Sequence, residues 1–195
     1  MSRRILILQG HPDAHATHFG HALAAAYRRG AESAGFSVEE IRLSELDYPM
    51  LASEKEWTEG ELPPSLRPAQ EAIDRADHLV LIFPLWLGTM PAKVKAFLEQ
   101  VLRPGFAFSA DARDGIGERH LKGKSARVVI TMGMPGLVYR WYFRAHGFRN
   151  LERNILKFCG IRPVRHCFVG LVAGKDDRRR RRWLARLERL GRAAR

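Results

Sequence analysis

Short apolar runs alternate with amphipathic stretches from one end of the chain to the other. The apolar runs predict five strands, at residues 3–10, 37–43, 77–86, 125–133 and 164–172. Apolar residues at helical spacing predict helices at residues 17–34, 65–76, 91–101 and 150–160, and a terminal helix within 175–195. Ser65 is placed to cap its helix, and Gly35 and Gly160 are typical helix stops. The stretch before Ser65, which includes Trp57, is polar and predicts a long loop.

Strands that alternate with helices predict an α/β fold with an open, doubly wound parallel sheet. The run at residues 77–86 is the most continuously apolar, as expected for a central strand that is covered on both faces. The length of 195 residues fits a single domain, residues 1–195. Ligands of such sheets bind beyond the carboxyl ends of the strands. The segments that leave the first, third and fourth strands are therefore the candidate site.

The formal net charge of +12 would suit an acidic partner such as nucleic acid. Much of the excess lies in residues 175–195, where arginines fall on one helical face and apolar residues on the other. The apolar residues are Trp183, Leu184, Leu187 and Leu190. We interpret this stretch as a packed terminal helix with a solvated basic face, and we expect no nucleic-acid partner.

Two further features concern the compartment. No apolar run approaches the roughly 20 residues that a membrane span needs. The two cysteines, Cys159 and Cys167, lie in or beside apolar segments and do not form a CxxC motif. We therefore expect a cytoplasmic protein whose cysteines are reduced thiols in the core.

The first candidate loop, "GHPDAHATHF", joins a strand to a helix. Gly10, Pro12 and the helix start near Thr17 would direct backbone N–H groups and a hydroxyl to one spot, which suits a phosphate. Neither GxGxxG nor GxxxxGK[ST] is present, so the cradle is of another kind. Four histidines crowd this segment and the following turn, namely His11, His15, His18 and His21. A metal site lacks an obvious complete ligand set, which leaves a phosphate or sugar contact from His11 or His18, or solvated histidines.

The second candidate loop, "PLWLGTMPA", follows the central strand. Trp86 would offer a flat apolar surface, Gly88 would allow another group to approach the backbone, and Pro91 suits a helix start. A planar ring could lie against the indole. The alternative is that Trp86 packs in the core.

The third candidate loop, "TMGMPGLVYRWYFRAHG", follows the fourth strand. Gly133 permits close approach, and backbone N–H groups near it could bond the polar edge of a heterocycle. Trp141 and Phe143 belong more naturally to the core or to a subunit contact.

Four segments resemble the flavodoxin-like NAD(P)H dehydrogenase (quinone) family. They are "ILILQGHPDAHATHFGHAL", "FPLWLGTMPAKVKAFLEQVLRPGFAF", "LKGKSARVVITMGMPG" and "ILKFCGIRPV". They occur in the family's order and cover most of the chain. The family includes DT-diaphorase-type quinone reductases, bacterial drug-activity modulators and flavoprotein subunits of potassium-efflux systems. The resemblance implies a flavodoxin-like sheet with strand order 2-1-3-4-5.

The resemblance also implies where a non-covalent flavin would lie. The phosphate and ribityl end would contact His11, Thr17, His18 and Phe19, the isoalloxazine would lie on Pro84, Leu85, Trp86 and Leu87, and its polar rim would face Thr131, Met132, Gly133 and Met134. Tyr139 and His146 resemble the family's catalytic tyrosine and histidine pair, and Phe106 and Phe108 match a segment that shapes the quinone pocket. No metal is implied. The chain departs from the family's pattern at Leu87, which replaces a second aromatic residue, and at "TMGMP", which replaces Thr-Thr-Gly-Gly.

The implied activity is flavin-dependent NAD(P)H:quinone oxidoreduction, with ping-pong hydride transfer that reduces a quinone or similar acceptor by two electrons. The flavin supplies this chemistry and the protein positions it. The quinone-reductase branch favours FAD, with FMN as the alternative, and a homodimer. The main rival is a flavin-binding regulatory subunit that docks on a membrane potassium-efflux transporter through the basic terminal helix.

Overall fold

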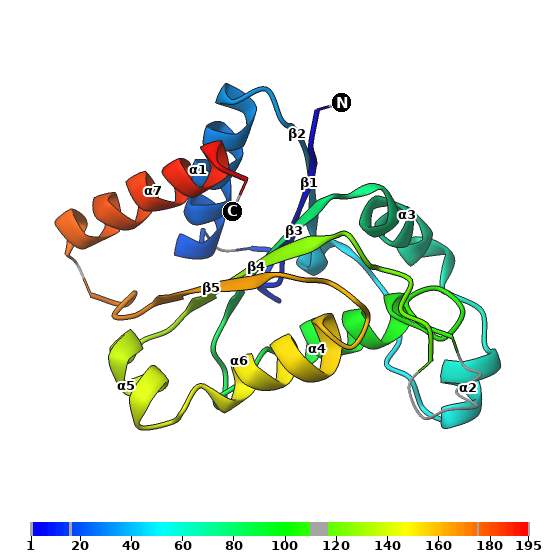
Figure 1. The fold of residues 1–195 in the computed structure, drawn as a ribbon. Helices are drawn as coiled ribbons and strands as arrows, with labels where there is room; N and C mark the ends of the chain where they lie inside the picture. Colours follow the sequence, from blue (N-terminus) through cyan, green and yellow to red (C-terminus); the bar gives the residue numbers. More distant parts are fainter. Residues whose placement is uncertain (1, 16, 110–116, 175, 195) are drawn as a thin grey trace.

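The computed structural model describes residues 2–15, 17–109, 117–174 and 176–194. Five parallel strands form one sheet in the order β2-β1-β3-β4-β5 (Figure 1). The strands are β1 (Arg4–Gln9), β2 (Ser37–Arg42), β3 (His78–Pro84), β4 (Ser125–Thr131) and β5 (Val164–Val169). The predicted flavodoxin-like sheet and its strand order are confirmed.

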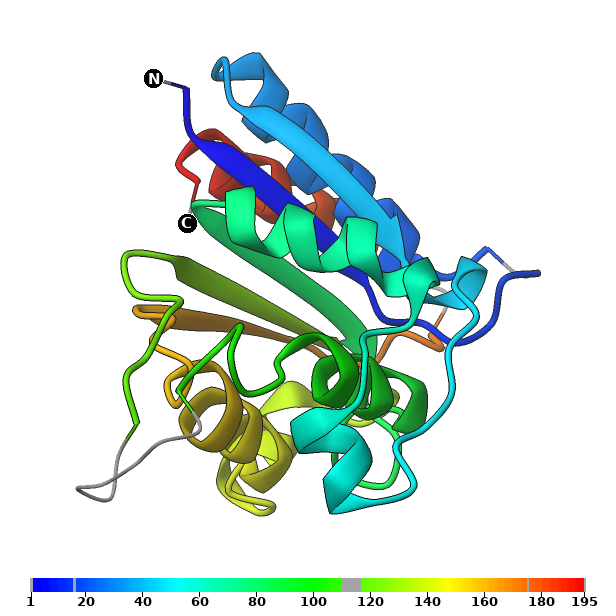
Figure 2. The same ribbon diagram turned by 90° about the vertical axis from the view of Figure 1, so that its right-hand side faces the viewer.

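Helices cover both faces of this sheet (Figures 1 and 2). Helices α1 and α7 lie on one face, and α3, α4 and α6 lie on the other. The helices are α1 (Phe19–Ser33), α2 (Glu54–Glu59), α3 (Arg67–Arg75), α4 (Ala92–Val101), α5 (Gly136–Trp141), α6 (His146–Asn150) and α7 (Asp177–Arg192). A π-helical segment, Leu151–Leu156, continues α6. Among the described residues, no helix is both long and apolar enough to cross a bilayer.

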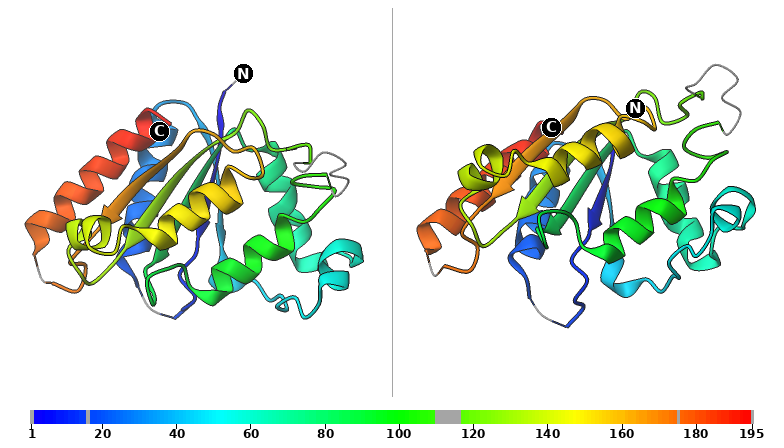
Figure 3. Two further views of the ribbon diagram at one scale, coloured as in Figure 1. Left: turned by 60° about the horizontal axis from the view of Figure 1, so that its bottom comes forward. Right: turned by 90° about the horizontal axis from the view of Figure 1, so that it is seen from below.

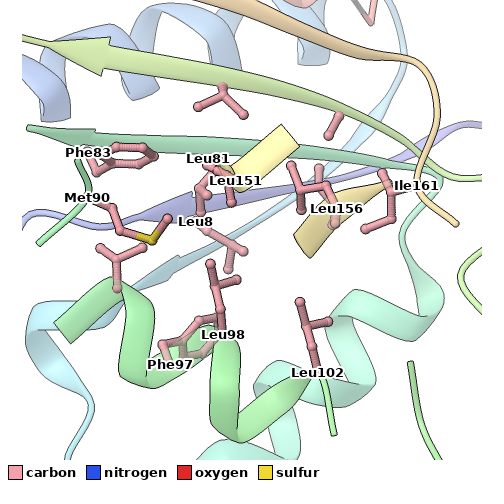
Figure 4. Packing of buried hydrophobic residues seen from close by; sticks show 14 of the residues in the cluster. Leu8, Leu81, Phe83, Met90, Phe97, Leu98, Leu102, Leu151, Leu156 and Ile161 are labelled. Carbon is pink, nitrogen blue, oxygen red and sulfur yellow. The ribbon is translucent and has the colours of Figure 1, made fainter. Parts of the chain in front are cut away.

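Two hydrophobic clusters fill the space between the sheet and these helices. Successive side chains of a strand point to opposite faces, so a strand that is covered on both sides is apolar throughout. Under α1 and α7, the strands contribute Ile5, Ile7, Val80 and Ile82. On the other face they contribute Leu6, Leu8, Leu79 and Leu81. Figure 4 shows Leu98 of α4 directed toward Leu8 and Leu81 of the sheet.

The terminal helix α7 packs directly against α1. A β-carbon on Gly30 of α1 would lie 1.9 Å from the carbonyl oxygen of Glu188, and one on Gly191 of α7 would lie 2.1 Å from that of Tyr27. The two helix backbones therefore touch where only glycine fits. The apolar residues predicted for the inner face of α7 are buried or partly buried in this cluster, namely Trp183, Leu184, Leu187 and Leu190. The prediction of a packed terminal helix is confirmed.

The polar stretch that was predicted to be a loop contains α2. The Ser53 hydroxyl accepts a hydrogen bond from the backbone N–H of Glu56, and this cap starts the helix. The buried guanidinium of Arg103 donates to the carbonyl oxygens of Glu56 (2.9 Å) and Gly60 (2.6 Å), where α2 ends. Both ends of this short helix are thus satisfied by side chains.

The predicted cap at Ser65 is wrong. Helix α3 begins at Arg67 after a 3₁₀ turn, Pro64–Leu66. The Ser65 hydroxyl donates instead to the carbonyl oxygen of Asp47 at 2.6 Å, which ties the helix start to the preceding loop.

The two cysteines are buried free thiols, as predicted. Both are 2% exposed, and burial raises the pKa of Cys159 to about 12. The Cys159 thiol therefore stays protonated at neutral pH.

Candidate functional site

Three loops meet at the carboxyl end of the sheet, which Figure 3 turns toward the viewer. They are residues 10–15 and 17–18 after β1, residues 85–91 after β3 and residues 132–135 after β4. The N–H of Gly10 donates to the carbonyl oxygen of Ile82 at 2.7 Å, and the N–H of Leu85 donates to that of Thr131 at 2.7 Å. The first and second loops are therefore each anchored to the neighbouring strand, at the edge of the sheet where the parallel strands end.

The first loop leaves β1 at a position where only glycine fits. A β-carbon on Gly10 would lie 2.7 Å from a methyl carbon of Val94 and 3.1 Å from the β-carbon of Phe83. The chain therefore passes close under α4 before it turns outward to His11.

Three imidazole rings stack at the start of α1. The ring centroids of His11 and His18 lie 3.4 Å apart, and those of His18 and His21 lie 5.8 Å apart. Asp13 organises this group, since its N–H donates to Nδ1 of His11 (3.2 Å) and its carboxylate accepts from Nε2 of His18 (3.0 Å). Nε2 of His21 is buried and has no hydrogen-bond partner among the described residues.

His11 and His21 favour the neutral form. Burial lowers the pKa of His11, and the neighbouring His18 and His21 lower it further. Burial also lowers the pKa of His21, together with the nearby Arg42. Hydrogen bonds from the His15 N–H and from His18 lower the pKa of the Asp13 carboxyl. Among the described residues, no group of histidine, cysteine and acidic side chains has an arrangement that could hold a metal ion.

The N-terminus of α1 is open toward an anion. His18 occupies the N-cap position, and its side chain does not bond the N–H groups of the first turn. Thr17 is exposed beside it, and Phe19 is the first helical residue. The free N–H groups and the positive end of the helix dipole favour a phosphate or another anion here.

The second loop is a tight two-residue hairpin. Trp86 and Thr89 exchange two backbone hydrogen bonds of 3.0 Å each, and Leu87 and Gly88 both have positive φ, 46° and 81°. Glycine adopts this conformation readily, whereas Leu87 is strained in it. Trp86 is 49% exposed and Leu87 is fully exposed. Trp86 therefore is not a core residue, and its ring stands edge-on to His11 with 6.1 Å between centroids.

The third loop presents mostly backbone atoms, rather than side chains, to the candidate site. Thr131 and Met132 are buried, and Met134 is partly buried against the same cluster. A β-carbon on Gly133 would meet nothing within 4 Å, so the backbone there is open to an approaching group. Of the four residues predicted for the polar rim, Gly133 provides the open surface.

The structure places the two predicted catalytic residues in different surroundings. Tyr139 is 1% exposed, and its hydroxyl accepts a hydrogen bond from the Phe148 N–H (3.1 Å) and donates to the Gly88 carbonyl oxygen (3.4 Å). Burial raises the pKa of Tyr139. His146 is exposed in the first turn of α6. No hydrogen bond joins the two side chains in the described part of the chain.

Phe108 lines a cavity of about 410 Å³, away from the three loops. Its ring contacts those of Phe158 (4.9 Å) and Trp57 (6.0 Å), which sequence reasoning did not assign to a site. The α4 residues that line this cavity are Lys95, Leu98 and Glu99, all beyond the hairpin, and none of the described residues of the three loops lines it. Phe106 is partly buried beside this region and does not line the cavity. A single chain therefore does not bring Phe106 and Phe108 to the three loops.

Comparison with known proteins agrees with this architecture. A family model described as "flavodoxin-like fold" matches residues 3–190. An uncharacterised NAD(P)H oxidoreductase of Haemophilus influenzae is 27% identical over 180 residues, which cover 90% of this chain and 88% of that protein. Rat NAD(P)H dehydrogenase [quinone] 1 is 28% identical over 187 residues, which cover 83% of this chain and 66% of the rat enzyme.

A solved structure and a relative that matches over a shorter stretch complete the comparison. The NAD(P)H:quinone oxidoreductase of Methanothermobacter marburgensis superposes with a TM-score of 0.82 at 26% identity, covering 98% of this chain and 96% of that one. The glutathione-regulated potassium-efflux system ancillary protein KefG of Cronobacter sakazakii is 41% identical over 66 residues, which cover 33% of each chain.

Proposed function

The chain belongs to the flavodoxin-like NAD(P)H dehydrogenase (quinone) family and is an oxidoreductase, and we propose that it is a flavin-dependent NAD(P)H:quinone oxidoreductase. The observation that carries this proposal is the meeting of three loops around the exposed Trp86. His11 approaches the indole from the first loop, and the Leu85 N–H bonds the second loop to Thr131, the residue of β4 after which the third loop begins.

The residues present fit a flavin. The open N-terminus of α1, with His11, Thr17, His18 and Phe19, would hold the phosphate and ribityl end. The hairpin residues Pro84, Leu85, Trp86 and Leu87 would support the isoalloxazine, with Thr131, Met132, Gly133 and Met134 at its polar rim. Two observations on the described chain support this fit: Nε2 of His21 has no hydrogen-bond partner, and the space beside the Gly133 α-carbon is open.

A bound flavin would supply hydride acceptance from NAD(P)H and two-electron transfer to a quinone or similar acceptor. The protein's own part is to hold the donor and then the acceptor over one apolar face, in ping-pong order. Tyr139 would fix the position of the hairpin that carries Trp86, because its hydroxyl donates a hydrogen bond to the Gly88 carbonyl oxygen. The exposed His146 would exchange a proton with the acceptor.

FAD is the proposed flavin, with FMN as the alternative, and the proposed location is the cytoplasm. The experiment is to purify the protein, record its absorbance near about 450 nm, release the chromophore by heat and identify it. NADH or NADPH oxidation is then measured with a quinone. A correctly folded protein that is colourless and takes up neither flavin would refute the proposal.

In a homodimer, the three loops of one subunit and the Phe108 region of the other could form the acceptor pocket together. Trp141 and Tyr142 of the α5 region are 72% and 80% exposed, and the Phe108 cavity lies apart from the three loops of its own chain. Large exposed aromatic side chains favour a subunit contact. Light scattering should give twice the 22.2 kDa chain mass, and Trp141→Arg should reduce that mass to one chain.

A regulatory flavoprotein subunit is the second candidate. The similarity to the potassium-efflux ancillary protein favours it, as do the exposed arginines of α7. It predicts that the protein fractionates with membranes that contain a potassium-efflux transporter, and that neutralisation of residues 178–182 releases it. Full quinone reductase activity in a protein that never associates with such membranes would favour the enzyme.

A further inference from the structure

A basic groove runs along the outer edge of β5, between α5 and α7. Its volume is about 640 Å³, within the range of small-molecule sites. Figure 3 shows α5 (yellow-green) and the first turns of α7 (orange) at the carboxyl end of β5. The side chains that give the groove its character are Arg140, His166, Arg179, Arg182, Trp183 and Arg186. Two helices that are distant in sequence thus direct guanidinium groups to one hollow.

Within the part of the chain that the structure describes, most of these guanidinium groups have no carboxylate partner. Arg179 forms an ion pair with Asp176 at 3.6 Å. Within the described chain, Arg140, Arg182 and Arg186 have no carboxylate within ion-pair distance. Outside the groove, Arg28, Arg42, Arg75 and Arg192 each pair with a glutamate. Three guanidinium groups that have no carboxylate in the described chain therefore line one groove.

The arginines of α7 also oppose the helix dipole. Residues 178–182 are five consecutive arginines in the first turns of the helix, where the dipole is positive and acidic residues are favourable. Asp176 caps the helix and Asp177 follows it, but they offset only part of this charge. Such an unfavourable concentration of positive charge is typical of a binding site in which a bound anion supplies the missing negative charge.

The groove begins next to the proposed flavin site. Pro135 and Gly136 line it, and Gly136 is only three residues after Gly133, so their α-carbons are at most about 11 Å apart. A dinucleotide whose nicotinamide lay near Gly133 would have enough length to reach the arginines.

We propose that this groove binds the phosphate groups on the adenosine half of the electron donor, and that it makes the enzyme prefer NADPH over NADH. The inference rests on the proposed function. NADH and NADPH share the pyrophosphate, but NADPH adds a 2′-phosphate, the group that clustered arginines bind best. The guanidinium of Arg186 lies 4.9 Å from the Trp183 ring centre, and this pair offers a flat surface against which a base can lie.

The first test measures binding without turnover. Adenosine 2′,5′-bisphosphate and 5′-AMP are titrated by calorimetry into the purified protein, the double variant Arg140→Gln/Arg182→Gln, and Arg189→Gln. Arg189→Gln is the control because it removes a charge from α7 outside the groove. We expect the bisphosphate to bind at least about tenfold more tightly than AMP, and the double variant alone to lose this preference. Equal affinity for the two nucleotides, or equal loss in the control, overturns the inference.

The second test separates this inference from the proposed function. The ratio of kcat/KM for NADPH to that for NADH should fall about tenfold in the double variant and stay constant in Arg189→Gln. A working quinone reductase whose ratio is unchanged overturns the inference and leaves the function intact. Suppose that the protein binds no flavin but still binds the bisphosphate more tightly than AMP through these arginines. That result would refute the proposed function, whereas the inference that the groove binds phosphate groups would stand. If anionic vesicles or DNA bind through the two arginines and the bisphosphate does not, the groove serves a macromolecular surface and the inference is wrong.

Discussion

The hydroxyl of Tyr139 donates a hydrogen bond to the carbonyl oxygen of Gly88, which lies 51 residues earlier in the chain. The same hydroxyl accepts from the buried N–H of Phe148. Gly147 adds to this contact, because a β-carbon there would lie 2.2 Å from the same Gly88 oxygen. The segment that follows β4 thus holds the turn of the hairpin that follows β3. Any role of Tyr139 in turnover acts at least partly through the position of Trp86.

Replacement of Tyr139 by Phe should lower both stability and turnover while flavin remains bound. The change removes the only described partner of the buried Phe148 N–H, which costs about 1–3 kcal/mol. It also frees the hairpin, so the apolar face is held less well. Urea unfolding measures the first effect, and steady-state NAD(P)H oxidation measures the second.

Tyr142→Phe is the matched control for this substitution. Tyr142 is 80% exposed, and its ring contacts Phe143. Removal of its hydroxyl should change the free energy of unfolding by no more than about 0.5 kcal/mol. Equal losses of unfolding free energy in the two variants would show that the hydrogen bonds of the Tyr139 hydroxyl do not stabilise the fold.

The contact between α1 and α7 should be intolerant of a single methyl group. In Gly30→Ala the new carbon would lie 1.9 Å from the carbonyl oxygen of Glu188, so the helices must separate. The expected loss is at least about 2 kcal/mol, although alanine favours the helix itself. Thermal and urea unfolding measure it.

Gly20→Ala in the same helix is the comparison. Its β-carbon would lie 3.7 Å from a methyl carbon of Ile82, an ordinary contact. We expect no loss of stability, or a gain of up to about 1 kcal/mol. A Gly30→Ala variant as stable as Gly20→Ala would contradict the close helix contact.

The fold could be predicted from the sequence because each central strand carries its own signal. β1 and β3 are covered on both faces and read as continuous apolar runs. α7 could be predicted because its apolar residues recur on one face above an arginine run. The start of α2 had a readable signal in Ser53 and Glu56, but its other end depends on Arg103, a residue 43 positions beyond Gly60. Such distant support has no local signature.

The candidate site was predictable only in part for a similar reason. The loops could be assigned because they follow the strands that a doubly wound sheet brings together. The burial of Tyr139 and the separation of Phe108 from the loops depend on how α5, α6 and α4 pack. The basic groove needed the juxtaposition of Arg140 with α7 across β5, which no sequence spacing encodes.

Protonation of His78 should destabilise the fold in mild acid. The ring is 2% exposed, Nδ1 lies 2.8 Å from the Ser125 hydroxyl, and burial, with nearby Arg3, Arg127 and Arg165, lowers its pKa to about 3. The unfolded chain takes up this proton near about pH 6.5, so its contribution to stability is full above that pH and falls as pH decreases toward the folded pKa. The loss approaches about 3 kcal/mol by about pH 4.5.

His78→Gln tests this effect because glutamine can hydrogen-bond but does not titrate. Urea unfolding at about pH 7 and about pH 4.5 should show a smaller loss in the variant than in the parent protein. Other groups with lowered pKa, including His166, remain in both proteins and cancel in the comparison. Identical losses would show that His78 titrates normally in the folded state.

The stacked histidines of the first loop should link flavin binding to protons. Without a ligand, His11 and His21 have lowered pKa values, since both are partly buried and lie close to His18. Asp13 faces His11, and Arg42, Glu40 and Glu45 face His21. A phosphate bound at the N-terminus of α1 would favour the protonated rings and raise both pKa values. Affinity for the phosphorylated flavin should therefore increase as pH decreases.

Fluorescence titration from about pH 8 to about pH 6.5 measures this dependence, a range in which the phosphate itself keeps most of its charge. We expect the flavin that heat releases from the protein to bind about threefold to tenfold more tightly at the lower pH. Riboflavin, which has no phosphate, should show no such gain, and His11→Asn/His21→Asn should flatten the slope for the phosphorylated flavin. A slope that persists in the double variant would assign the proton to a group other than His11 and His21, because asparagine cannot titrate.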